Sequence, residues 1–189
     1  FWAYGALVLA QLPLYARAVL HGDERVLTLL LVTFSIGVAA GSLLCERLSG
    51  RKVEIGLVPF GSIGLTLFAL DLYFATPVLP AAASLDLAGL LRLDGGWRIV
   101  ADLGLLGVFG GFFIVPLYAM VQQRTPRERI SRVQSANNIL NALFMVGAAA
   151  VGALALQAGW SVPQLLLFAA ILNAGVAIYL YTLVPEFLL

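Results

Sequence analysis

Three ionisable side chains lie within or at the margin of long apolar runs of the sequence: Arg17, Asp71 and Asp102. A charge at the centre of a lipid bilayer costs about 2.5 to 3.5 kcal/mol, so such residues usually face a partner or a water-filled cavity. A cluster of Arg17 with Asp71 or Asp102 would satisfy this need, and either carboxylate is a candidate for binding a coupling proton or cation. Two alternatives stay open: the side chains reach the membrane surface, or Arg98 pairs with Asp102 one helical turn away.

A polar stripe is expected along one face of a helix near residues 134–157. Its members are spaced i, i+3, i+4 and i+7, and they are Gln134, Asn137, Asn138 and Asn141. Amides donate and accept hydrogen bonds without carrying charge, so they suit the ester and phosphate oxygens of a lipid headgroup. Polar contact between helices is the alternative role. A weaker stripe on the first apolar run combines Gln11 with Tyr15, one helical turn apart.

Several classes of function are disfavoured by what the sequence contains. There is one cysteine, Cys45, and one histidine, His21, which excludes disulfide frameworks and metal sites with several His or Cys ligands. No nucleophile, base and orienting group can be assembled, and no carboxylate pair or Gly-rich phosphate loop is recognisable. We therefore expect neither an enzyme nor a cofactor in this chain. The net charge of +1 also argues against a nucleic-acid partner.

The elements that position these residues are apolar helices. The sequence is 61% hydrophobic and 11% charged, whereas soluble domains carry about 25% charged residues. Runs of roughly 20 apolar residues are long enough to cross a bilayer. Six spans are predicted, at about 1–20, 26–46, 53–75, 98–121, 134–157 and 163–184. A short interfacial segment is expected between the third and fourth spans, over residues 84–97. The fold class is therefore an all-α membrane protein.

Small residues are placed to bring helices together. Gly37 and Gly41 form a GxxxG pattern in the second span, and Gly107 and Gly111 form another in the fourth, with Gly104 one turn earlier. Such spacing lets helix backbones approach closely where lipid removes the usual hydrophobic drive. The pattern predicts a tight bundle.

Orientation follows from the basic residues, because cytoplasmic loops retain positive charge. Seven of the 11 Lys and Arg residues lie in two loops, near residues 46–54 and 122–132. Both loops and both ends of the chain are therefore expected on the cytoplasmic side. The sequence begins and ends inside apolar runs, so we expect a fragment of a longer protein.

The stretch Gly41-Ser-Leu-Leu-Cys-Glu-Arg-Leu-Ser-Gly-Arg-Lys52 resembles the signature loop of major facilitator superfamily transporters. In that family the loop holds helix ends together in one state and releases them in another. The resemblance implies a cytoplasmic gate made of Glu46, Arg47, Arg51 and Lys52. The acidic residue of this stretch is Glu46, where the family usually has Asp. Compared with the spacing in the family, Glu46 lies one residue later in the sequence and Gly50 lies two residues later.

A closer likeness covers nearly the whole chain. Two parts of the sequence resemble bacterial lysophospholipid transporters, including forms fused to an acyltransferase. They are Val53-Glu-Ile-Gly-Leu-Val-Pro59, and Gly110-Gly-Phe-Phe-Ile-Val-Pro-Leu117 with Gln122, Gln123 and the amide stripe. The segment Gln11-Leu-Pro-Leu-Tyr15, together with Arg17, also resembles these lysophospholipid transporters. The resemblance implies the C-terminal six-helix half of a twelve-helix transporter, built as two inverted three-helix repeats.

The same resemblance implies the partners and the site. Lysophospholipid would be the substrate in the bacterial inner membrane among its lipids. An N-terminal six-helix half and a fused or associated acyltransferase would be protein partners. The residues expected to face the substrate are Gln11, Tyr15, Arg17, Asn137, Asn138 and Asn141, with Arg17 meeting the phosphate. Two alternatives stay open: a facilitator of another small solute or drug, and a membrane anchor for the acyltransferase.

Overall fold

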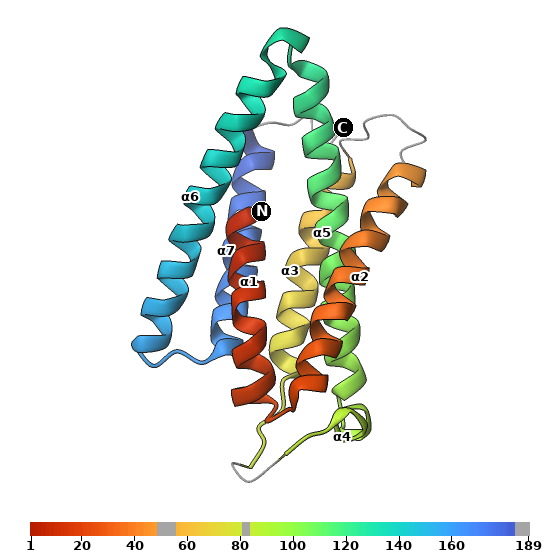
Figure 1. Cartoon of the computed structure of the whole chain (residues 1–189), viewed down its shortest axis with the longest axis vertical. Helices are drawn as coiled ribbons and strands as arrows, with labels where there is room; N and C mark the ends of the chain where they lie inside the picture. Colours follow the sequence, from red (N-terminus) through yellow and green to blue (C-terminus); the bar gives the residue numbers. More distant parts are fainter. Residues whose placement is uncertain (49–55, 81–83, 184–189) are drawn as a thin grey trace.

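The computed structural model describes residues 1–48, 56–80 and 84–183, and this part of the chain is a bundle of helices (Figure 1). No strand occurs in these ranges. The helices are α1 (Trp2–Leu14), η1 (Tyr15–Val19, a π-helix), α2 (Glu24–Leu48), α3 (Leu57–Ala75), α4 (Leu87–Arg92), α5 (Gly96–Arg124), η2 (Arg127–Arg129, a 3₁₀-helix), α6 (Ile130–Gln157) and α7 (Val162–Leu183).

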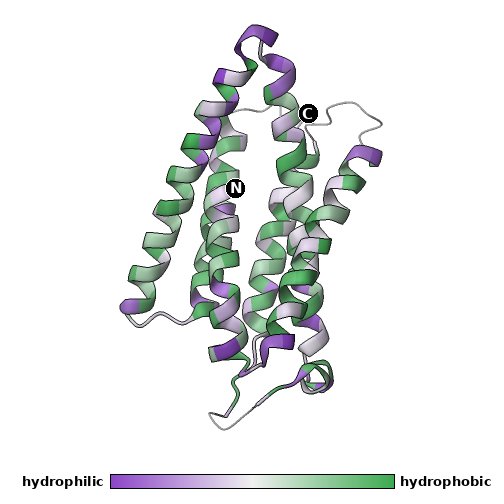
Figure 2. Cartoon of the chain, in the orientation of Figure 1, coloured by the Kyte–Doolittle hydropathy of each residue, from purple (hydrophilic) through white to green (hydrophobic). Residues whose placement is uncertain are grey.

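Five of the predicted spans are confirmed as helices long and apolar enough to cross a membrane, counting only the described residues. They are α2, α3, α5, η2 with α6, and α7. Figure 2 shows apolar residues along the length of the bundle and hydrophilic residues gathered at its two ends. Large apolar side chains such as Ile36, Phe74 and Val146 are exposed on the outer faces of the helices. These features indicate an all-α membrane protein.

The first predicted span is helical but changes its winding. The α-helix α1 has 13 residues and continues directly as the five-residue π-helix η1. Pro13 lies just before this change. Proline has no N–H for the helix ladder and its ring clashes with the carbonyl four residues earlier, so a local change of winding is expected near it. A membrane crossing by α1 and η1 stays a prediction.

The segment expected at the membrane surface contains the short helix α4, at one end of the bundle (Figure 1). Its interfacial place stays a prediction. Asp86 caps it by accepting a hydrogen bond from the Gly89 backbone N–H at 2.7 Å. Leu90, on the inner face of this helix, is fully buried. Backbone hydrogen bonds between Leu85 and residues 21 and 23 join this connection to the α1–α2 turn. The described part of this connection is therefore held against the α1–α2 turn by backbone hydrogen bonds.

The basic segments lie together at the opposite end. Figure 1 shows the last turn of α2 and the α5–α6 turn at the end of the bundle remote from α4. Arg47 lies in the last turn of α2, Arg124 ends α5, and Arg127 and Arg129 lie in η2. The described residues of the two predicted basic loops thus share one end, as the charge pattern predicts. Arg51 and Lys52 lie outside the described residues.

Helix packing follows a simple order. The most extensive contacts are those of α2 with α5 and of α3 with α5, followed by α3 with α7 and α1 with α6. By contrast, α6 and α7 scarcely touch, although they are consecutive. The amide-bearing helix α6 is therefore held to the bundle mainly through α1.

The glycine patterns lie where α2 crosses α5, so the predicted close approach of helix backbones is found between these two helices. A Cβ atom added to Gly37 would collide with the backbone of Gly104, and one added to Gly41 would collide with the backbone of Val108. Seen from α5, a Cβ atom on Gly107 would strike the backbone of α2 at Phe34. The two backbones touch without side chains between them. Any residue larger than glycine must push the helices apart.

We expect Gly37→Ala to destabilise the protein by about 1 to 3 kcal/mol, the usual cost of overpacking a core. The control is Gly175→Ala in α7, because no atom lies within 4 Å of a Cβ atom placed there. Alanine favours a helix over glycine by about 1 kcal/mol, so the control should be neutral or stabilising. Thermal unfolding in detergent, followed by circular dichroism, measures both. Equal midpoints for the two variants would contradict close α2–α5 packing.

Candidate functional site

Two helices contribute three N–H groups to one phenol oxygen on a third helix. The Tyr118 hydroxyl on α5 accepts hydrogen bonds from Asn137 Nδ2 at 3.2 Å and Asn141 Nδ2 at 3.0 Å, both on α6. It also accepts one from Trp2 Nε1 at 3.1 Å, at the start of α1. We call these four residues the Tyr118 cluster. Two members of the predicted amide stripe thus belong to it, joined by two residues that the sequence did not single out.

The Tyr118 cluster has more donors than its own oxygen can use. A phenol oxygen has two lone pairs, whereas three N–H groups point at it. Each carboxamide also has a second N–H, and the indole N–H can only donate. None of these side chains carries a charge. The chemistry of the cluster therefore suits a ligand with several oxygen acceptors.

The depth of the Tyr118 cluster follows from helix geometry. Tyr118 lies six residues before Arg124, the end of α5, so it is about 9 Å from that end at 1.5 Å rise per residue. Tyr118, Asn137 and Asn141 are half-buried, whereas Asn138 is exposed. The cluster is thus inside the apolar part of the bundle, near its basic end, and keeps one side open.

Gln11 and Tyr15 lie inside the bundle, away from the Tyr118 cluster. Gln11 is 7% exposed, and its amide lies against Gly152 of α6. Tyr15 is fully buried, and its hydroxyl is hydrogen-bonded to Thr76 Oγ1 at 2.8 Å. Tyr15 therefore connects η1 with the end of α3, and Gln11 lies where α1 meets α6.

Arg17 does not join the acidic residues of the spans. Its guanidinium lies 3.8 Å from the Glu24 carboxylate, and these side chains are 63% and 91% exposed. An exposed pair of this kind contributes little to stability. The prediction that Arg17 clusters with Asp71 or Asp102 is therefore wrong, because η1 presents Arg17 at the surface of the bundle.

Arg98 is the cation that pairs with Asp71. Its Nε donates to Asp71 Oδ2 at 2.8 Å, and its Nη2 donates to Asp71 Oδ1. The Asp71 carboxyl also contacts that of Asp102. We call these three residues the outer acidic cluster, because the charge pattern predicts that their end of the bundle faces outward. The expectation that no carboxylate pair exists is wrong, because folding places the end of α3 beside the beginning of α5.

Asp102 is the buried member of the outer acidic cluster. It is 3% exposed, and its Oδ2 atom is buried without a hydrogen-bond partner. Buried polar atoms are almost always hydrogen-bonded, so this orphaned oxygen is unusual. Arg98 lies one turn earlier on α5, but its Nε and Nη2 atoms donate their hydrogen bonds to Asp71. A strictly local Arg98–Asp102 pair is thus not the main contact.

A second polar group joins α3 and α7. Asn173 Nδ2 lies 3.0 Å from the Ser62 carbonyl oxygen, 3.3 Å from Ser62 Oγ and 2.9 Å from Thr66 Oγ1. Ser62 is 1% exposed. This contact was not predicted from the sequence, although an amide within an apolar span was the available signal. Its role is to connect two helices.

Two residues of the predicted gate lie among the described residues. Glu46 and Arg47 are exposed in the last two turns of α2. Glu46 takes part in a side-chain interaction. Their place at the basic end agrees with the expected location of the gate, and its operation stays a prediction.

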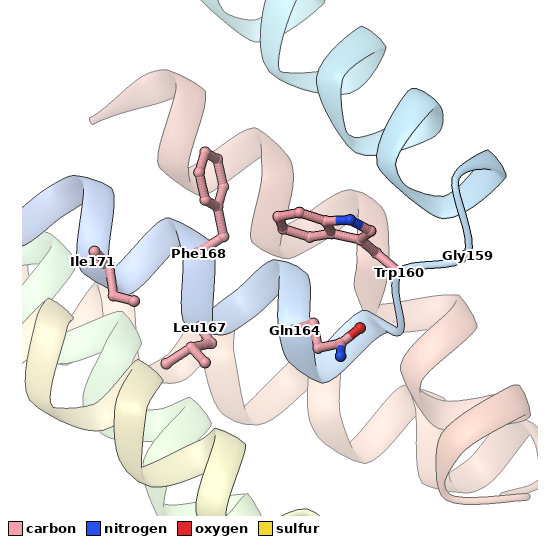
Figure 3. A pocket seen from close by; sticks show the side chains of 6 residues that line it. All are labelled: Gly159, Trp160, Gln164, Leu167, Phe168 and Ile171. Atoms are coloured by element: carbon pink, nitrogen blue, oxygen red, sulfur yellow. The ribbon is translucent and has the colours of Figure 1, made fainter.

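An open apolar groove of about 410 Å³ lies beside the α6–α7 turn. In Figure 3, Trp160 comes from the turn, whereas Gln164, Leu167, Phe168 and Ile171 come from α7. The Trp160 and Phe168 rings meet edge to face at 5.7 Å. Gln164 is engaged, because its Oε1 accepts from the Ser161 backbone N–H at 2.8 Å. None of the predicted site residues lines this groove.

Comparison with known proteins identifies no relative. No protein-family model matches the chain, and no curated protein or solved structure matches it. Among the described residues, no group of three or more His, Cys, Asp or Glu side chains is arranged to hold a metal ion. The Tyr118 cluster is accordingly the best candidate for a ligand site on structural grounds.

Proposed function

We propose that this chain is the C-terminal half of a major facilitator transporter that moves lysophospholipid from the outer to the inner leaflet of a bacterial inner membrane. The observation that carries the proposal is the Tyr118 cluster, an uncharged group of donors within an apolar bundle. A lysophospholipid has one acyl chain and a headgroup rich in phosphate and ester oxygens. Apolar helix faces suit the chain, and the donors suit the oxygens.

The helix pairing supports an arrangement in two repeats. Two repeats would match α1 with α5, α2 with α6 and α3 with α7. Under this matching the α2–α5 pair corresponds to the α6–α1 pair, and the α3–α7 pair corresponds to itself. All three pairs are among the most extensive contacts of the bundle. Two inverted repeats related by an axis in the membrane plane would produce this symmetry.

The charge distribution supports a direction of insertion. With the basic end in the cytoplasm, both ends of the chain are cytoplasmic, and α4 and the outer acidic cluster face outward. Glu46, Arg47, Arg51 and Lys52 would then form the inner gate. Arg17, exposed at the outer end, would meet the phosphate before the headgroup reaches the Tyr118 cluster. Alternating access would also need the N-terminal six-helix half, and an acyltransferase would consume the imported lipid.

The proposal is tested with the full-length protein in sealed proteoliposomes. Labelled lysophospholipid is added outside, and its arrival in the inner leaflet is measured by protection from a membrane-impermeant quencher. Empty liposomes are the control for spontaneous movement. We expect protein-dependent movement of lysophospholipid and no uptake of soluble solutes. Movement of a soluble solute alone would favour a facilitator of another class. If neither lysophospholipid nor a soluble solute moves, a membrane anchor for an acyltransferase is the better explanation.

Replacing Arg17 with Ala is expected to lower lysophospholipid movement by roughly tenfold or more, because a hydrogen bond to a charged group contributes about 1.5 to 3 kcal/mol. Arg25→Ala is the matched control, since Arg25 is exposed near the same end of the bundle. Both rates are measured in the quencher assay at equal protein density. Unchanged movement in Arg17→Ala would remove Arg17 from the site and would leave the Tyr118 cluster to be tested separately.

A further inference from the structure

The outer acidic cluster combines two carboxyl groups with one guanidinium. Asp71 comes from the last two turns of α3, and Arg98 and Asp102 come from the first two turns of α5. Arg98 directs two nitrogens at the two Asp71 oxygens, so its charge is matched by that of Asp71. If Asp102 were ionised as well, the cluster would hold one negative charge in excess.

The surroundings of Asp102 do not stabilise that extra charge. Its side chain is 3% exposed, and Oδ2 has no hydrogen-bond partner. An ionised carboxylate accepts hydrogen bonds at both oxygens, and a buried one without them is strongly disfavoured. The neighbouring Asp71 carboxylate carries the same sign of charge. Two carboxyl groups in contact commonly resolve this conflict by sharing one proton.

A bound metal cation fits the cluster less well than a proton does. The Arg98 guanidinium already stands beside the carboxyl groups, and its positive charge would repel a second cation. Cations such as Na⁺ and Ca²⁺ also need several oxygen ligands, whereas the described part of the chain has no group of three acidic, His or Cys side chains. A proton needs only the pair of carboxyl oxygens.

We propose that Asp71 and Asp102 together hold one exchangeable proton at the end of the bundle that carries α4. Asp102 is the protonated member and donates to the Asp71 carboxylate, which Arg98 keeps ionised. On release, the proton passes from Asp102 to Asp71 and from there to water, leaving both groups as carboxylates. No electron is transferred. The Asp71 side chain is 34% exposed, which provides the path to water.

The other titratable groups around Asp102 are few. Tyr15, on η1, is close enough to be influenced by the Asp102 charge, but its hydroxyl is engaged with Thr76. On α5 the neighbour is Arg98, and on α3 it is Asp71. The apolar residues Val26 and Leu30 of α2 and Leu90 of α4 belong to the same core. Among the described residues of this region, the carboxyl pair is therefore the group placed to take up and release a proton.

Infrared difference spectroscopy of the full-length protein in lipid tests the proposal without any transport substrate. The C=O stretch of a protonated carboxylic acid is separate from the bands of carboxylates. We expect such a band at neutral pH, and its loss in Asp102→Asn and at high pH. Asp71→Asn should shift the band, because it changes the acceptor of the proton. Asp94→Asn, at an exposed position near the same end, should leave it unchanged.

Both outcomes of each comparison are informative. Identical spectra for the unchanged protein and Asp102→Asn over the whole pH range would overturn the proposal. Size-exclusion chromatography shows whether Asp102→Asn still folds. If it does not, Asp71→Asn decides, because a band that neither moves nor changes its pH dependence in that variant excludes a shared proton. The result is independent of whether lysophospholipid is moved.

Discussion

Replacing Asn137 and Asn141 together with Leu is expected to reduce lysophospholipid movement by about 100-fold. The charged headgroup would lose one hydrogen bond for each amide that is removed, and each bond contributes about 1.5 to 3 kcal/mol. The two losses together amount to several kcal/mol. The control is Ser135→Leu, which adds an apolar side chain at an exposed position of the same helix. Rates are compared in sealed proteoliposomes at equal protein density.

Tyr118→Phe provides a second measurement on the same cluster. It removes one oxygen and leaves the ring, so the helices should keep their packing while three N–H groups lose their common acceptor. If these donors serve only to join helices, thermal stability should fall and lysophospholipid movement should be kept. If they bind the headgroup, the Michaelis constant for lysophospholipid should change as well. Unchanged transport in both variants would exclude the Tyr118 cluster as a substrate site.

Replacing Arg98 with Met is expected to cause the largest loss of stability of any single removal of a charge. The substitution leaves the ionised Asp71 carboxylate, which lies beside Asp102, without its cation. This unpaired negative charge should lower the unfolding midpoint at neutral pH. Since protonation removes negative charge, the midpoint of the variant should recover as the pH falls. Thermal unfolding in detergent at several pH values measures this dependence.

Two controls separate this effect from a general loss of packing. Arg92→Met removes an exposed arginine in the last turn of α4 and should change the midpoint little. Adding Asp71→Asn to Arg98→Met removes the carboxylate that has lost its cation, so stability should be restored in part. A similar fall in both arginine variants, or no recovery in the double variant, would contradict the charge assignment.

The apolar spans were predictable because each one is a local property of the sequence. The lengths of α2, α5 and α7 follow from runs of apolar residues bounded by charges or by turn residues. Close packing of helix backbones was also predictable, since Gly37 and Gly107 leave no side chain to separate helices, although the pairing of α2 with α5 was not predicted. The winding of η1 was not predictable, because Pro13 indicates a disturbance without specifying its form.

The polar clusters were only partly predictable because they depend on which helices become neighbours. The spacing of Asn137 and Asn141 placed them on one face of α6, but no sequence pattern connects that face with Tyr118 or Trp2. In the same way, Asp71 and Arg98 are separated by 26 intervening residues, among them α4, and meet only after α3 has packed on α5. Burial and charge identified the residues that need partners, whereas tertiary packing chose the partners.

The glycine contacts between α2 and α5 have a mechanical consequence. Side chains can change rotamer as neighbouring helices slide, but touching backbones have no such freedom. Together with α3, which packs closely on α5, these helices should behave as one stiff block. In contrast, α6 meets the rest of the bundle chiefly along α1 and could tilt without separating any glycine pair. Rearrangement within the bundle should therefore take place on the α6 side, where two amides of the Tyr118 cluster are carried.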